Sequence, residues 1–172
     1  MKHQKVYISG PMTSSDNEEQ ERNVQAFHDC ATLINSHTGL RPVNPANAWP
    51  CKHPRIYRLM ERLLGEDGAY RTVLLYDLWL LSRSDSICMI DGWQQSRGAK
   101  IEENFAFRLG IVRSHTYDSK QRKLMPFQKG KKKYKLDEQQ PVSEVVAAVA
   151  ALGNAMSRMG SSNKKNELKR NK

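Results

Sequence analysis

The chain has 172 residues, of which 38% are hydrophobic and 27% charged, and its net charge at pH 7 is +10. This length suits one domain with a substantial core and excludes two full-sized domains. No stretch approaches the roughly 18 apolar residues of a membrane span, the amino terminus lacks the apolar run of a secretion signal, and the three cysteines lack CxxC spacing, so we expect a soluble cytoplasmic protein with reduced thiols.

The first part of the chain follows the pattern strand, helix, strand. Residues 6–8 form a β-prone run that breaks at a Ser-Gly-Pro sequence. Apolar residues at helical spacing between positions 24 and 34 predict a helix, and Gly39 terminates it. Residues 40–43 predict a second strand, closed by an Asn-Pro pair.

The middle of the chain predicts a loop, two helices and a third strand. Prolines make residues 46–54 a loop. Helical patterns cover residues 55–64 and about 69–81, and Gly65 closes the first of them. Residues 86–90 are apolar apart from the first and predict a buried strand, which an Asp-Gly-Trp turn follows.

A third helical pattern covers residues 98–109, with Gly110 as its cap and a fourth strand at 111–115. The alternation of strands and helices predicts a parallel sheet with right-handed crossovers. The expected fold class is therefore α/β, with a Rossmann-like (flavodoxin-like) sheet flanked by helices and a ligand site at the carboxyl ends of the strands.

The C-terminal part is predicted to be a basic extension. Residues 1–118 would form the α/β domain. Residues 119–159 would form a basic loop or hairpin and a helix packed on that domain, and residues 160–172 would form a disordered tail. Nine basic residues face one acidic residue between Arg113 and Lys135, and five face one in the last twelve residues. Such charge favours a solvated surface, with attraction to nucleic acid or another phosphate-bearing partner as the alternative.

Several residues fall at the predicted carboxyl ends of strands and at the start of the third helix. Small residues there let backbone amides approach an anion or a sugar. The expected substrate contacts are Ser9, Gly10, Pro11, Asn44, Gly92, Trp93, Ser96 and Gly98. Trp93 suits capping the sheet and stacking on a base equally well.

Two carboxylates are the candidates for chemistry. Glu102 is expected in the first turn or so of the third helix, where the helix dipole favours its ionised form. Asp77 lies on the preceding helix, and glycosidic chemistry uses two carboxylates in different environments. Acidic residues also occur in first turns simply because they complement the dipole. The histidines show no metal-ligand spacing, so neither a metal nor a cofactor is expected.

Sequence segments in a fixed order resemble the nucleoside 2-deoxyribosyltransferase-like superfamily, in particular a small branch encoded by phages and bacteria. These segments are residues 7–13, 44–46, 76–78, Asp85, 92–93 and 96–102. The resemblance implies a homo-oligomer in which neighbouring subunits complete the site. It also implies cleavage of an N-glycosidic bond through a glycosyl-enzyme, resolved by water in a hydrolase or by another base in a deoxyribosyltransferase.

The resemblance assigns roles to individual residues. It makes Glu102, six residues after Ser96, the nucleophile. It gives Asp77 assistance to the sugar or the leaving base, places Tyr7 in the catalytic set, and gives Ser96 a contact with a 5′-phosphate. Glu103 leaves an ambiguity of register at the nucleophile position.

The sequence departs from the nucleotide hydrolases in the first loop, where they carry Ser and Arg to bind phosphate and this chain has Pro11 and Thr13. Arg22, Arg97 or a residue of the 49–58 loop would have to supply the charge. The alternative to an enzyme is a non-catalytic protein that binds a nucleotide or an NAD-derived molecule in the same place, because fold does not fix function.

Overall fold

A computed structural model of the protein describes residues 4–47 and 53–126. The predicted C-terminal helix and basic tail, together with Trp49 and Cys51, lie outside the described residues. No helix in these two ranges is long and apolar enough to cross a membrane.

The helices and strands alternate through most of this part of the chain. In chain order they are β1 (Lys5–Ser9), α1 (Asn17–Thr38), β2 (Arg41–Val43), the short 3-10 helix η1 (Pro45–Asn47), α2 (Pro54–Ser82), β3 (Ser86–Ile90), the 3-10 helix η2 (Trp93–Gln95), α3 (Arg97–Arg108), β4 (Val112–Asp118) and β5 (Lys123–Pro126).

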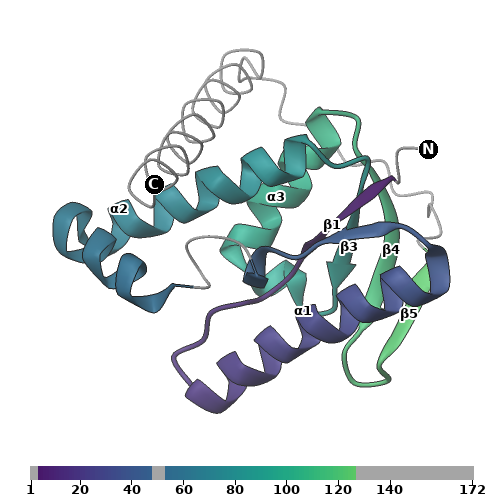
Figure 1. The fold of residues 1–172 in the computed structure, drawn as a ribbon, viewed down its shortest axis with the longest axis horizontal. Helices are drawn as coiled ribbons and strands as arrows, with labels where there is room; N and C mark the ends of the chain where they lie inside the picture. Colours follow the sequence, from purple (N-terminus) through teal and green to yellow (C-terminus); the bar gives the residue numbers. More distant parts are fainter. Residues whose placement is uncertain (1–3, 48–52, 127–172) are drawn as a thin grey trace, which may run out of the picture. The chain divides into compact units, whose positions relative to one another are not determined.

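The strands form one sheet in the order β2-β1-β3-β4-β5. The first four strands are parallel, and β5 runs antiparallel to β4 (Figure 1). This arrangement confirms the predicted α/β, Rossmann-like fold. The segment after β4 takes the hairpin form of the two predicted alternatives, and β4 extends past the predicted end at 115 because β5 pairs with it.

Helix α1 covers one face of the sheet (Figure 1). Its amino end is capped by Asp16, whose carboxylate accepts the Glu18 amide, and it ends at Gly39 with φ 65°. The core on this face consists of Val6, Ile8, Phe27, Cys30, Ile34, Cys88, Ile90 and Tyr117. Cys30 and Cys88 are free and buried, with their Sγ atoms 3.7 Å apart, as expected for reduced thiols.

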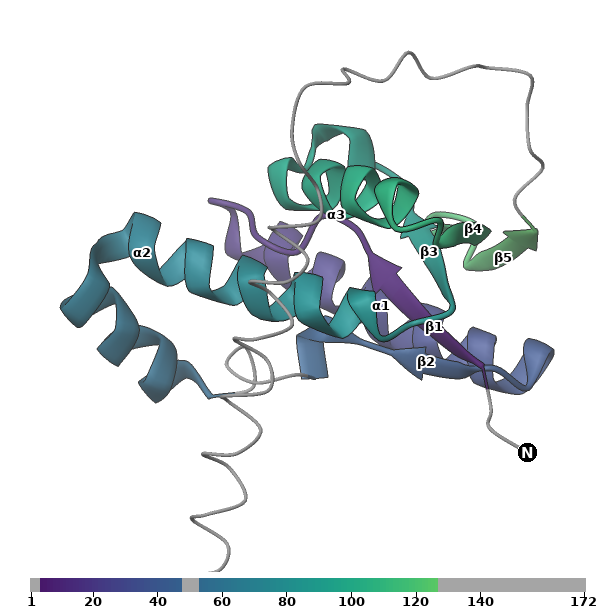
Figure 2. The same ribbon diagram turned by 90° about the horizontal axis from the view of Figure 1, so that it is seen from above.

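Helices α2 and α3 pack beside each other on the opposite face (Figure 2). Helix α2 contains one non-helical residue, Gly65, with φ 73° and ψ 168°, and the helix bends there. The predicted break at Gly65 is therefore confirmed. The second segment starts immediately after it rather than near Ala69, because one glycine in the left-handed region suffices to redirect the chain.

Successive residues of β1 point to opposite faces of the sheet. Val6 and Ile8 face α1, whereas Tyr7 and Ser9 face α3 and contact it through their hydroxyl groups. This alternation delivers two hydroxyl groups from one strand to the helix that carries the predicted nucleophile.

Candidate functional site

The direction in which the chain adds strands to the sheet reverses at β1. From β1 the chain passes to β2 on one side and then returns to β3 on the other side. Open α/β sheets bind ligands at such a switch point, outside the carboxyl ends of the two strands. The carboxyl ends of β1 and β3 are Ser9 and Ile90, so the segments that follow these residues mark the expected position of the site.

Glu102 lies at this position on the face of α3 that meets β1. Its side chain is 6% exposed, and both carboxylate oxygens are hydrogen-bonded. The Tyr7 hydroxyl donates to Oε1 at 2.7 Å, and the Ser9 hydroxyl donates to Oε2 at 2.5 Å. Two donors hold the carboxylate in one orientation, and one of them is Ser9, a residue expected to contact substrate.

Glu102 occupies the second turn of α3, not the first. The dipole field falls off within the first turn, so the expected stabilisation by the helix is weak here. Burial instead raises the pKa of Glu102 from 4.5 to about 7, while the hydrogen bonds from Ser9 and Tyr7 lower it. The carboxyl group therefore exchanges its proton in the neutral range.

Asp77 lies on the second segment of α2, which packs against α3, and it is 9% exposed. Burial raises the pKa of Asp77 well above its usual 3.8, and the charge of Glu102 raises it further. Among the described residues, the hydrogen bonds found at these two carboxyl groups are donated by Tyr7 and Ser9, and Glu102 accepts them. The two carboxyls are thus unequal: Glu102 is favoured as the anion, and Asp77 as the neutral acid.

We refer to Tyr7, Ser9, Asp77 and Glu102 as the carboxylate site. The structure brings together the three residues predicted to be catalytic, from β1, α2 and α3. Chemically, the site offers a buried carboxylate held by two hydroxyl donors beside a second buried carboxyl group whose pKa is raised by burial and by the charge of the first. Such a pair can attack or stabilise a positive centre with one member and transfer a proton with the other.

The glycines predicted to contact substrate shape the loops at the ends of β1 and β3. A Cβ on Gly10 would lie 2.7 Å from the Cβ of Ile90, so only glycine lets the two strand ends approach this closely. Gly92 has φ 78°, and a Cβ there would lie 3.8 Å from the Pro11 ring. The loops after β1 and β3 therefore meet above the sheet edge.

Asn44 and Ser96, also predicted to contact substrate, make local hydrogen bonds. The Asn44 Oδ1 atom accepts the Ala46 amide at 2.9 Å, whereas its Nδ2 is buried and has no partner among the described residues. The Ser96 hydroxyl caps α3 by accepting the Ala99 amide at 3.3 Å. An unpaired buried donor such as Asn44 Nδ2 is costly unless something else, such as a ligand, satisfies it.

Trp93 and Glu103 belong to a separate cluster. Arg113 donates to the Glu103 carboxylate at 2.7 Å and lies 4.8 Å above the Trp93 ring, which is buried. One face of the indole is thus occupied by Arg113. The two adjacent glutamates also face different parts of the fold, because Glu103 points to Arg113 and Glu102 to β1.

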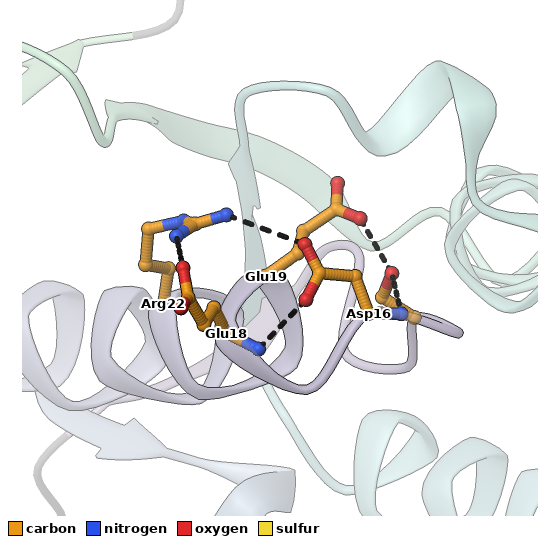
Figure 3. Close-up of polar contacts among 5 residues, drawn as sticks. Asp16, Glu18, Glu19 and Arg22 are labelled. Atoms are coloured by element: carbon orange, nitrogen blue, oxygen red, sulfur yellow. Dashed lines mark hydrogen bonds and ion pairs between the residues drawn. The ribbon is translucent and has the colours of Figure 1, made fainter.

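The two arginines considered for phosphate differ in position. Arg22 is exposed on α1 and pairs with Asp16 at 3.9 Å and Glu18 at 3.6 Å (Figure 3). Arg97 begins α3, and its guanidinium lies 5.6 Å from the centre of the Tyr70 ring. Of these two, Arg97 is the one on the helix that carries Glu102.

Sequence reasoning missed Tyr70 of α2. Its hydroxyl is buried and has no hydrogen-bond partner within the described ranges. The charges of Glu102 and Asp77 both act on it. The only sequence signal was its spacing of seven residues from Asp77, which places the two on one helix face.

Asp85, a member of the resembling sequence segments, lies away from the site. Its carboxylate accepts the Lys5 amide at 2.7 Å, and its amide donates to the Lys5 carbonyl. It therefore joins the amino ends of β1 and β3. In the ranges 4–47 and 53–126 no three His, Cys, Asp or Glu side chains gather where they could hold a metal ion.

A family described as Domain of unknown function (DUF4406) matches residues 4–113, a span that contains the whole carboxylate site, Tyr70 and Arg97. No curated protein matches the sequence.

Proposed function

The chain belongs to the DUF4406 family, and from the arrangement of its two buried carboxyls we propose that it cleaves the N-glycosidic bond of a nucleotide or nucleoside. Glu102 acts as the nucleophile and Asp77 as the general acid and base. Tyr7 and Ser9 orient Glu102 and stabilise its ionised form.

The observation that carries this proposal is the unequal environment of the two carboxyls. Both are buried, yet Glu102 accepts hydrogen bonds from Tyr7 and Ser9, while the pKa of Asp77 is raised well above its usual value by burial and by the charge of Glu102. Pairs of titratable groups whose environments separate their protonation states identify the acid and the base. A protein that only binds its ligand has no need of this separation.

In the first step the Glu102 carboxylate attacks the anomeric carbon of the sugar, and the bond between that carbon and the base nitrogen breaks. The electron pair of this bond leaves with the base, and the proton of Asp77 neutralises it. The products are a free base and an ester between the sugar and Glu102.

In the second step Asp77, now a carboxylate, removes a proton from water while the water oxygen attacks the anomeric carbon. The ester bond breaks, and Glu102 returns as a carboxylate. If another base attacks in place of water, the outcome is base exchange, so the same residues serve a hydrolase and a deoxyribosyltransferase.

The substrate class rests on the resemblance to the nucleoside 2-deoxyribosyltransferase-like superfamily. Two features of the site agree with a polar ligand at this edge. The Asn44 Nδ2 is buried without a partner among the described residues, and the loops after β1 and β3 meet closely. Arg97 offers a positive charge at the start of α3 for a substrate that carries a phosphate. The same resemblance supports a homo-oligomer, and the cysteines without CxxC spacing support a cytoplasmic location.

The test is incubation of the full-length protein with nucleosides, deoxynucleoside monophosphates and NAD, with free base followed by chromatography. Glu102→Gln should abolish base release, because glutamine retains the shape of the side chain but is a poor nucleophile. Glu103→Gln removes the same charge at the next position, where the carboxylate faces Arg113, and should retain activity.

Base release lost in both variants, or in neither, would contradict the assignment of Glu102. If the wild-type protein releases no base but binds one of these compounds tightly in calorimetry, the protein is instead the ligand-binding module that the sequence left open. A mass increase of Glu102 by one sugar after rapid quenching would identify the ester directly.

A further inference from the structure

The Tyr70 hydroxyl is a polar group of α2 that the hydrogen bonds among the described residues leave unused. It is buried, and none of the residues that the structure describes forms a hydrogen bond with it. A buried hydroxyl without a partner loses its hydrogen bonds to water and gains none in return, which destabilises the folded protein. Native proteins retain such groups where a ligand completes the bond.

The position of Tyr70 connects it to the carboxylate site. Tyr70 and Asp77 are two turns apart on one face of α2. On α3, a Cβ at Gly98 would lie 3.6 Å from the Tyr70 hydroxyl, and Gly98 is one turn from Glu102 on the same face. The hydroxyl thus lies within contact distance of position 98, one turn before Glu102 on α3.

The direction of the two helices places Tyr70 toward the open edge of the sheet. Helix α2 leads into the amino end of β3, so its earlier residues lie nearer the carboxyl edge than its later ones. Helix α3 starts at that carboxyl edge, with Gly98 in its first turn. Along both helices, therefore, Tyr70 lies outward of Asp77 and Glu102.

We propose that the Tyr70 hydroxyl is a substrate-binding group that donates a hydrogen bond to the exocyclic 5′ oxygen of the sugar. This inference rests on the proposed function, in which Glu102 faces the anomeric carbon and Asp77 protonates the departing base. Asp77 lies at the inner end of the site, so the outer end receives the part of the sugar farthest from the glycosidic bond.

Two neighbours suit Tyr70 to this role. Burial and the charges of Glu102 and Asp77 raise the pKa of its hydroxyl, with the Arg97 charge opposing them, so it remains a neutral donor. The Arg97 guanidinium over the ring, 5.6 Å from its centre, restricts the rotation of the side chain. A donor held in place before binding loses little entropy when the substrate arrives.

The test compares Tyr70→Phe with the wild-type protein on the common ribonucleosides and 2′-deoxynucleosides, each beside its 5′-deoxy counterpart. Loss of one neutral hydrogen bond should raise KM about fivefold for nucleosides with a 5′-hydroxyl and leave KM for the 5′-deoxy compounds unchanged. The melting temperature of Tyr70→Phe should equal or exceed that of the wild type, because the hydroxyl has no hydrogen-bond partner among the described residues. Tyr57→Phe, on the part of α2 before Gly65, is the matched control and should change neither KM.

An equal rise in KM for both members of each pair would overturn the assignment to the 5′ oxygen, and a lower melting temperature with unchanged KM would show a structural role. Both results leave N-glycosidic cleavage standing. If the wild-type protein binds the nucleosides without cleaving them, the proposed function is wrong, and dissociation constants in the same comparison decide the role of Tyr70. If it neither binds nor cleaves any of these nucleosides, the assignment of Tyr70 to the nucleoside 5′ oxygen is wrong, and the deoxynucleoside monophosphates of the earlier test decide the proposed function.

Discussion

The Tyr7 hydroxyl donates a 2.7 Å hydrogen bond to Glu102 across 95 positions of sequence. Both groups are buried, so the bond forms only when β1 and α3 are packed together. The strand that begins the sheet and the helix that carries the proposed nucleophile therefore assemble as one unit.

Tyr7→Phe should lower base release at neutral pH by about 10- to 100-fold. A hydrogen bond to a charged group contributes about 1.5–3 kcal/mol, and its loss leaves less of the Glu102 carboxylate ionised. The pH at which activity reaches half its maximum should therefore move upward, which a pH profile of kcat measures. An unchanged midpoint with lower activity throughout would show that Tyr7 acts in another way.

Asp77→Asn should reduce base release by about 10²- to 10⁴-fold, the usual contribution of a positioned acid. The loss should be smaller for 7-methylated purine nucleosides, whose base already carries a positive charge and departs without a proton. Rates on the methylated and ordinary nucleosides, measured in parallel, check this. If both substrates suffer equally, Asp77 has a role other than protonating the base.

The protein should gain stability as the pH falls from 8 to 5. The pKa of Glu102 is about 7 in the folded protein against 4.5 ordinarily, so the folded state binds this proton more tightly than the unfolded state. The stabilisation is fully present below 4.5 and is lost as the pH rises through 7. Burial raises the pKa of Asp77 in the same direction.

Glu102→Gln removes the contribution of Glu102 to the pH dependence of stability. The difference in stability between this variant and the wild type therefore measures that contribution. Relative to the wild-type protein, the variant should be more stable by about 1–3 kcal/mol at pH 8 and no more stable at pH 5, since each pKa unit corresponds to about 1.4 kcal/mol. Chemical denaturation of both proteins at several pH values gives the difference. A constant difference across this range would contradict the raised pKa of Glu102.

Gly10→Ala should destabilise the protein by about 1–3 kcal/mol, the usual cost of overpacking. Its new Cβ would lie 2.7 Å from the Ile90 Cβ, and neither atom can move without the strand ends moving apart. Gly98→Ala is the matched comparison, because its Cβ meets the Tyr70 hydroxyl at an ordinary 3.6 Å. Gly10→Ala should therefore have a lower melting temperature than Gly98→Ala. Equal melting temperatures would show that the end of β1 shifts at little cost to make room for the new Cβ.

Local sequence signals predicted most of the fold. Gly39, Gly65 and Gly110 have φ values of 65°, 73° and 70°, which few other residues adopt, so each marked a true break or end of a helix. The apolar runs of β1 and β3 likewise identified buried strands. These signals depend only on neighbouring residues.

Features that depend on distant partners were not predicted. The length of β4 is set by β5, and the register between β3 and β4 shifts by one residue of β4 between the pairs Ile87–Arg113 and Cys88–His115. The depth of Glu102 under β1, and hence its raised pKa, follows from tertiary packing. Tyr70 lies near α3 because of the way in which α2 packs against α3. The residues around Tyr70 in the sequence do not indicate this packing.

The lateral strands of the described sheet are short, three residues in β2 and four in β5. Pro42, at the centre of β2, has no amide hydrogen to offer to an incoming strand. Neither edge strand of the described sheet therefore offers the long, flat row of backbone groups with which a strand of a second chain would pair. Pairing with a strand of another molecule, and fibril growth from these two edge strands, are therefore disfavoured.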